Sequence, residues 1–267
     1  IALFLGSGML VSVQAASSAI LIATLIPVHG PGGLQRVWHA IIGTVIGIAI
    51  MALIPANPVR DIRRRLASIV QIEREILGDI ASGLRTRNPE LVTKALVRIR
   101  STQPALNDIR DTLYNGAEVV RVSPLLWYAR KDLKKWEKLL DPLDNAIRNT
   151  RVLARRAVVI LDDDVPLDVR IPDSISLMSE ATGVVHSMLS ESDNRHATEQ
   201  EAARAIISVA VRTTFQLDPN DRSGMHGPVI HAQIRSTLID LLQVCGMSRE
   251  EAVNSVPAIG SPGCHPA

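Results

Sequence analysis

Acidic residues are missing from the first part of the chain. No Asp or Glu precedes Asp61, and Arg36 is the only charged residue before position 60. All 27 acidic residues, and all of the 29 basic residues except Arg36 and Arg60, lie from Asp61 onward, so that this later part has no net formal charge. The chain therefore consists of two physically different parts, one suited to apolar surroundings and one to water.

Several classes of function lack the sequence features that they need. The two cysteines, Cys245 and Cys264, are too few for a disulfide framework, and their spacing fits no metal site. The phosphate loop GxxxxGK[ST] and the nucleophile motif GxSxG are both absent. The balanced charge of the later part is not typical of a nucleic-acid-binding surface, which carries a basic excess. We therefore predict no catalytic residue, no metal, no cofactor and no nucleic-acid partner, and expect that the protein is not an enzyme.

Residues 1–58 contain long uncharged runs, which predict transmembrane helices. A helix of about 20 apolar residues crosses a bilayer core of about 30 Å. The sequence PVHGPGG at 27–33 indicates a turn, residues 37–54 are predicted to span, and PANP at 55–58 ends the span. The chain begins with Ile-Ala-Leu-Phe and has no initiator Met, so we expect residues 1–58 to be the end of a larger membrane domain.

Basic residues follow the last predicted span directly, at Arg60, Arg63, Arg64 and Arg65. Such residues mark the cytoplasmic side and are expected to anchor the chain at the membrane surface. Arginine strongly outnumbers lysine, which together with abundant Ala and Val hints at a GC-rich bacterial genome. The predicted location is a multi-pass protein of the bacterial inner membrane, with its C-terminal domain in the cytoplasm.

Residues 59–260 show helical periodicity throughout, which predicts an all-α cytoplasmic bundle. From Val59 to Ile80 apolar residues recur at three- and four-residue steps, interrupted only by Glu73. A further helix is predicted to begin at about residue 89 and to be kinked or split at Pro104. The next helix is predicted to begin at residues 122–124 and to extend to about residue 161. The last helices are predicted at about 173–190, 198–217 and 226–245, followed by a disordered tail at 261–267.

Helix starts carry recognisable caps. Asn88 can cap a helix whose first position is Pro89. Thr198 with Glu201, and Ser248 with Glu251, have the spacing of capping boxes.

Four polar residues in the apolar part are candidates for a substrate path or proton coupling: Gln14, Arg36, His39 and Thr44. A charged or titratable group near hydrocarbon is costly and so suggests function. Each residue also has a structural interpretation. Arg36 could extend to the interface, His39 could form an interfacial hydrogen bond, and Thr44 could bond within its own helix.

Gly43 and Gly47 form a GxxxG pattern, which in a membrane favours close helix packing. Outside the apolar part, His226 and His231 lie five residues apart without a matching carboxylate, so we interpret them as solvated residues at a helix start. The run Asp162, Asp163 and Asp164 could hold a divalent cation, but more often such a run ends a helix in water.

The order of these parts resembles the fusaric acid resistance and aromatic acid exporter superfamily, often labelled FUSC-like. The resemblance rests on ASSAILIATLIPVHGPGGLQRVWHAIIGTVIGIAIMALIPANP and on LDNAIRNTRVLARRAVVIL. In that family an arginine leads a helix with a short glycine and threonine motif that ends near a proline. The positions that match this pattern here are Arg36, Gly43, Thr44 and Gly47. Pro55 and Pro58 stand where the helix ends.

The resemblance implies an efflux permease for aromatic or other weak organic acids that is driven by the proton gradient. Arg36 would then attract a carboxylate and His39 would carry or sense a proton. The implied partners are the lipid bilayer, a small organic acid and a second copy of the chain. One alternative is a membrane-anchored interaction or regulatory protein whose helical bundle binds a partner. Another is a soluble helical enzyme with residues 1–59 buried in protein.

Overall fold

The computed structural model describes residues 16–17, 20, 38–47, 58–122, 127–190, 195–213 and 224–257. The chain divides into two compact units, Ile1–Ala56 and Asn57–Ala267. All regular secondary structure in the described residues is helical, which confirms the predicted all-α class. The predicted tail, 261–267, lies outside the described residues.

The predicted membrane location is contradicted. Among the helices that the structure describes, none combines the length and the apolar character needed to cross a bilayer. In the first unit the described residues are 16–17, 20 and 38–47, and all of them are helical. The longest helices have 28 and 36 residues but carry charged side chains along their length. The predictions of transmembrane helices and of a multi-pass protein of the inner membrane are therefore wrong.

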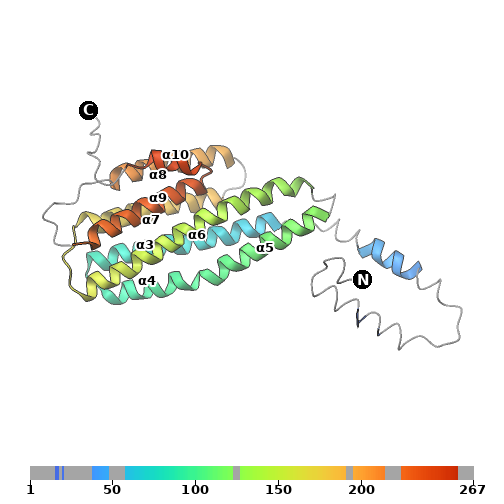
Figure 1. The fold of residues 1–267 in the computed structure, drawn as a ribbon, viewed down its shortest axis with the longest axis horizontal. Coiled ribbons are helices and arrows are strands. Elements are labelled where there is room, and N and C mark those ends of the chain that lie inside the picture. Colours follow the sequence, from blue (N-terminus) through green and yellow to red (C-terminus); the bar gives the residue numbers. More distant parts are fainter. Residues whose placement is uncertain are drawn as a thin grey trace. The chain divides into compact units, whose positions relative to one another are not determined.

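The second unit is a bundle of helices that lie side by side (Figure 1). In chain order these are α3 (Pro58–Arg85), α4 (Pro89–Ser101), α5 (Gln103–Val122), α6 (Trp127–Asp162), α7 (Arg170–Ser190), α8 (Arg195–Thr213), α9 (His226–Val244) and α10 (Arg249–Ser255). α4 and α5 follow each other in line, and α6 returns along them. The break between α4 and α5 at Thr102 confirms the predicted split at Pro104.

One hydrophobic core joins these helices. α3 packs against α4 on one side and α7 on another, and α6 packs against α4, α5 and α9. Core side chains such as Ile76, Leu77, Ile80 and Trp136 are almost fully buried. From Ile62 to Ile80, the periodic apolar positions that predicted α3 face this core, because residues three and four apart share one face of a helix.

Two of the three predicted helix N-caps are present in the structure. Asn88 accepts a hydrogen bond from the backbone N–H of Leu91, with Pro89 at the first position, as predicted. Both hydrogen bonds of the Ser248 and Glu251 capping box are also present. The box predicted at Thr198 is wrong, because α8 begins earlier, at Arg195.

Candidate functional site

A groove lies beside α10 in the described bundle, and we call it the α10 groove. Its volume is about 1170 Å³. It is lined by Lys135, Lys138, Leu139 and Pro142 of α6, by Glu199, Gln200 and Ala203 of α8, by residues 243–248 at the end of α9, and by Glu251, Asn254 and Ser255 of α10. The groove is therefore built by four helices from well-separated parts of the sequence.

α10 is short, and two sets of hydrogen bonds hold it in place as one wall of the groove. At its start the Ser248 hydroxyl accepts from the N–H of Glu251, and the Glu251 carboxylate accepts from the N–H of Ser248. At its end the Arg235 guanidinium of α9 donates to the carbonyls of Pro257, Val256 and Val253, at 2.9, 3.2 and 3.4 Å. Both ends of the helix are thereby satisfied, as helix termini require.

The floor of the groove is apolar and its edges are polar. Leu139 and Val244 are buried beneath it. Across the groove Lys135 of α6 forms a 2.5 Å ion pair with Glu199 of α8. Lys138 is exposed at the same edge and forms no ion pair with a residue that the structure describes. An apolar floor, one available cation and several amide groups suit a segment of polypeptide.

The groove offers no activated nucleophile among its described side chains. Cys245 has a free thiol and lines the groove from a buried position. Burial, and secondarily the charge of Glu199, raise the pKa of this thiol to about 12. Because the thiolate is the reactive form, Cys245 stays inert at neutral pH.

A second polar cluster lies inside the bundle, where α3, α6 and α9 meet. Glu73 of α3 is fully buried, and the Thr150 hydroxyl of α6 donates to its Oε1 at 2.8 Å. Its Oε2 has no hydrogen-bond partner among the described residues. Asp240 of α9 is also buried and accepts a 2.8 Å hydrogen bond from the Asn149 side chain of α6.

Both buried carboxyls hold protons more tightly than usual. Burial raises the pKa of Glu73 to about 7; the hydrogen bond from Thr150 opposes this and the charge of Asp240 adds to it. Burial also raises the pKa of Asp240 to about 6, against the charge of Arg249 and the hydrogen bond from Asn149. Sequence reasoning noticed Glu73 only as an interruption of an apolar pattern and passed over Asp240. A carboxylate at a core position of a helical repeat is the signal that could have found Glu73.

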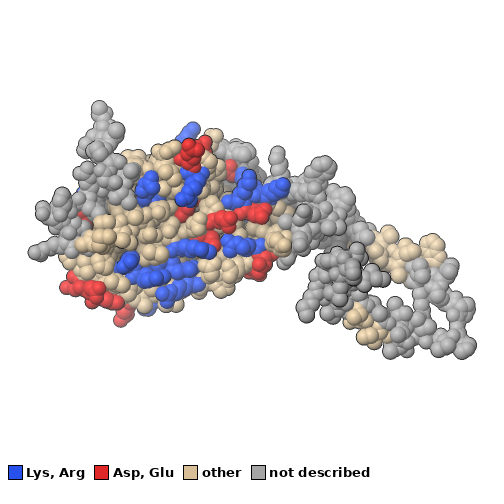
Figure 2. Space-filling view, in the orientation of Figure 1, with Lys and Arg blue, Asp and Glu red and all other residues tan. Residues whose placement is uncertain are grey.

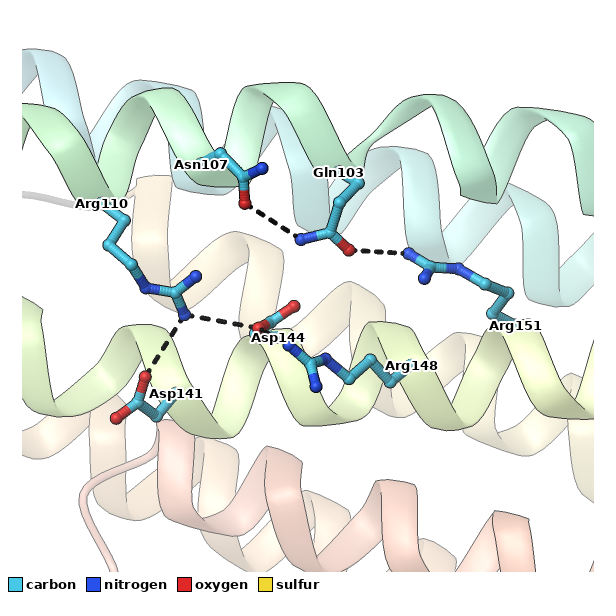
Figure 3. A network of polar contacts seen from close by, with 7 residues as sticks. All are labelled: Gln103, Asn107, Arg110, Asp141, Asp144, Arg148 and Arg151. Carbon is cyan, nitrogen blue, oxygen red and sulfur yellow. Dashed lines mark hydrogen bonds and ion pairs between the residues drawn. The ribbon is translucent and has the colours of Figure 1, made fainter.

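On the surface, α5 and α6 are joined by the polar network of Figure 3. Arg110 donates to Asp141 and Asp144 at 3.4 and 3.3 Å, and Arg148 donates to Asp144 at 2.8 Å. Burial alone would raise the pKa of Asp144, but the hydrogen bonds from Arg148 and Arg110 outweigh it, so this pKa is lowered. Further along, Gln103 accepts from Arg151 and donates to Asn107. We assign this network to helix pairing.

The visible face of the bundle carries both signs of charge. Figure 2 shows bands of Lys and Arg with Asp and Glu beside them. Arg98 of α4, for example, pairs with Glu75 and Asp79 of α3, at 2.7 and 3.2 Å. Such pairs link neighbouring helices.

The residues predicted for a substrate path are only partly within the described structure. Gln14 and Arg36 lie outside the described residues. His39 and Thr44 are exposed on the helix at 38–47, and the Thr44 hydroxyl donates to the carbonyl of Ala40 in its own helix at 2.7 Å. That hydrogen bond matches the structural interpretation of Thr44. A role for these residues in transport or proton coupling stays a prediction.

The two glycines predicted to pack lie on the same exposed helix. Apart from the adjoining residues and backbone of the same helix, no described atom lies within 4 Å of the position that a Cβ would take on Gly43 or Gly47. Close packing at these glycines therefore also stays a prediction.

The four arginines after the apolar part do not act as one group. The side chain of Arg60 lies outside the described structure. Arg65 forms ion pairs with Asp61 and Asp108, at 2.8 and 2.5 Å, and so ties α3 to α5. Arg63 and Arg64 instead line a small hollow towards α7. Membrane-surface anchoring by these arginines stays a prediction.

The interpretation of the two histidines as solvated residues at a helix start is wrong for His231, and for His226 only the position at the helix start is confirmed, because its Nδ1 is buried. His226 begins α9 and is half-buried, whereas His231 is 5% exposed and belongs to the bundle interior. Burial lowers the pKa of His231, against a hydrogen bond with the backbone of Thr213. In the acidic run, α6 ends at Asp162, and Asp164 adopts positive φ and pairs with Arg87. Its role as a helix end agrees with the structural interpretation.

Comparison with known proteins finds one relative, which is itself described as uncharacterized. No family model matches it, and no solved structure matches it. An uncharacterized protein of Corynebacterium glutamicum is 36% identical over 273 aligned residues, which cover 100% of this chain and 69% of that protein. The resemblance to the aromatic acid exporters stays a prediction, since none of these comparisons tests it. Because the alignment runs through both units, the chain belongs to the family of this uncharacterized Corynebacterium protein.

Proposed function

We propose that the helical unit, residues 57–267, is a binding module that holds a segment of a partner protein in the α10 groove. The observation that carries this proposal is the groove itself. Its volume of about 1170 Å³ exceeds the roughly 300–1,000 Å³ of typical small-ligand pockets. Its apolar floor and polar edges match the way amphipathic segments are recognised by grooves.

The groove selects one kind of occupant. An apolar side of the segment would lie on Leu139, Ala203 and Met247, which line the groove floor and its end. Lys138 would pair with an acidic side chain of the segment, because no described residue neutralises it. Because both ends of α10 are held by hydrogen bonds, this wall is ordered before binding, which lowers the entropic cost of association.

The predicted efflux of weak organic acids depends on membrane helices, which the described residues do not contain, and no comparison tests it. The comparisons also do not test the predicted acid substrate, the predicted homo-oligomer or the expectation that the protein is not an enzyme. They stay predictions. The alternative in which the helical bundle binds a partner is the one that a specific site supports.

A display library of random peptides, selected on the full chain, tests the binding function. We expect enrichment of amphipathic sequences with an acidic residue. Ala203→Trp fills the groove and should weaken binding of the enriched peptides at least tenfold. Lys138→Glu should weaken binding of the acidic peptides. Ala105→Trp makes the same substitution at an exposed position of α5, outside the groove, and should leave binding unchanged.

Two results would contradict the proposal. In the first, the library yields no common pattern. In the second, the enriched peptides bind Ala203→Trp as tightly as the unaltered chain, which would place their site elsewhere. Circular dichroism of each variant confirms that the bundle is folded.

A further inference from the structure

A second hollow lies where the beginning of α3 meets the end of α7, and we call it the α3–α7 pocket. Its volume is about 460 Å³. α3 contributes Arg63, Arg64, Ala67 and Ser68, and α7 contributes His186, Leu189 and Ser190. Residues 63 and 67 lie four positions apart on α3, as do residues 64 and 68, so the members of each pair are neighbours on the helix surface.

The two helices run in opposite directions, which places these residues opposite one another. The Ser179 hydroxyl of α7 donates to the carbonyl of Arg74 in α3, and Arg85 near the end of α3 pairs with Asp173 near the start of α7. This antiparallel register brings the first turns of α3 to the last turns of α7. The pocket therefore lies at one end of a long, well-packed helix pair.

Every ionisable side chain in the pocket lining can carry positive charge and none is acidic. The lining holds two guanidinium groups, one imidazole and two hydroxyls. Arg65, the next residue on α3, has its own acidic partners in Asp61 and Asp108. Arg64 forms no ion pair with any residue whose placement the structure gives. The positive charge of Arg64 is therefore open to an external anion.

The remaining groups make the pocket more than a charged surface. Ala67 and Leu189 are buried at its base, and an apolar base strengthens the attraction between charges by lowering the local dielectric. His186 is half-buried, and the Ser190 hydroxyl lies 3.4 Å from its Nε2 and donates to its backbone carbonyl at 2.9 Å. The imidazole and the hydroxyl are thus held together on the α7 side, facing the arginines of α3.

We propose that the α3–α7 pocket binds the oxyanion group of a small ligand, either a phosphate or a carboxylate. The guanidinium of Arg64 presents paired N–H donors that match two oxygens of such a group. The imidazole of His186 and the hydroxyl of Ser68 add donors from the two walls. The volume leaves room for an organic part beside the oxyanion. This site is separate from the α10 groove, because the two share no lining residue.

Calorimetric titration of the full chain tests the proposal, with inorganic phosphate in one arm and benzoate in the other, at constant ionic strength in chloride. We expect saturable binding of at least one of the two probes. Arg64→Ala and His186→Gln should each weaken that binding roughly tenfold, since each removes a charge-assisted hydrogen bond. Arg155→Ala is the matched control, because Arg155 is an exposed arginine of α6 that does not line the pocket.

The arms also separate the two ligand classes. Binding of phosphate alone assigns the pocket to a phosphorylated ligand, and binding of benzoate alone assigns it to an organic acid. The proposal is overturned if neither probe binds. It is equally overturned if Arg155→Ala weakens binding as much as Arg64→Ala does, because the attraction would then come from overall charge. Arg64 is exposed, so its replacement leaves the core intact, and circular dichroism checks this directly.

Discussion

At the scale of single residues, Glu73 places a carboxyl group inside the hydrophobic core. It is fully buried, and one of its oxygens has no hydrogen-bond partner among the described residues. An ionised carboxylate in such a place is costly, and the group responds by keeping its proton. Its pKa of about 7 therefore places a change of charge in the core within the physiological range.

We expect this group to make the stability of the bundle depend on pH. The pKa of Glu73 is raised on folding from 4.5 to about 7, so the folded state binds the proton more tightly than the unfolded state. Its contribution to stability is therefore fully present below about pH 4.5 and is lost as the pH rises through about 7. Asp240 acts in the same direction, from 3.8 to about 6. Urea denaturation of the full chain between about pH 4.5 and pH 8 should show that the free energy of unfolding falls as the pH rises.

The substitution Glu73→Gln should remove most of that pH dependence and stabilise the bundle at pH 8. The gain is up to about 3 kcal/mol, the cost of ionising a group with this pKa shift. Glutamine can still accept the hydrogen bond from Thr150. An unchanged difference in stability between pH 5 and pH 8 in the variant would show that Glu73 is not the titrating group. Asp240→Asn should remove the smaller remainder.

At the scale of helices, close approach between α3 and α4 depends on a glycine. A Cβ on Gly83 would lie 2.4 Å from Cγ2 of Val92 and 3.2 Å from the carbonyl oxygen of Asn88. Asn88 is the cap of α4, so this contact lies where the chain turns from one helix into the next. The position therefore has no room for a side chain.

We expect Gly83→Ala to destabilise the bundle. The gain in helix propensity is about 1 kcal/mol, whereas overpacking costs about 1–3 kcal/mol, so the clash prevails. Gly78→Ala in the same helix is the matched control, because its Cβ would meet only Ser179 Oγ, at an ordinary 3.8 Å. That variant should be neutral or more stable. Thermal unfolding distinguishes the two, and equal midpoints would contradict the expected clash.

α10 provides a second prediction at this scale, because Arg235 of α9 holds its C-terminal end. Arg235→Ala removes three hydrogen bonds to backbone carbonyls. Amide hydrogen exchange in α10 should accelerate roughly tenfold, while exchange in α3 stays unchanged, because local opening does not require global unfolding. Peptides selected for the α10 groove should also bind more weakly. Equal exchange rates in both proteins would show that the capping box alone holds α10.

At the scale of the whole molecule, the hydrophobic core that the structure describes lies within the second unit. All of its buried side chains lie between Ile62 and Val256. The described part of the first unit, by contrast, has only exposed residues. The stability of the bundle should therefore not depend on the first unit.

We expect residues 57–267 to fold when expressed alone and to unfold in a single cooperative transition. The thermal midpoint should match that of the bundle in the full chain, and the fall in stability with pH should persist, because Glu73 and Asp240 are both included. Differential scanning calorimetry of the fragment and the full chain makes the comparison. A fragment that lacks a cooperative transition would show that the first unit contributes to the core.

Sequence reasoning succeeded where the controlling interactions are local. Apolar residues at three- and four-residue steps predicted α3, and Asn88 with Pro89 predicted the start of α4. It failed at Thr198, where the spacing of a capping box is present but the helix begins three residues earlier. It also failed for the membrane location, because no helix that the structure describes is both long enough and apolar enough to cross a bilayer.

What the sequence determined by itself is therefore the helical class, most helix ends and the contrast between the two parts of the chain, since these depend on composition and on contacts within a few residues. Only the tertiary structure decided which polar groups are buried and which meet. Glu73 and Asp240 are far apart in the chain and share a core because α3, α6 and α9 pack together. The same long-range packing sets Arg64 opposite His186 and builds the α10 groove from separate segments. No local pattern records such contacts, because they depend on the free energy of burying whole helix faces against one another.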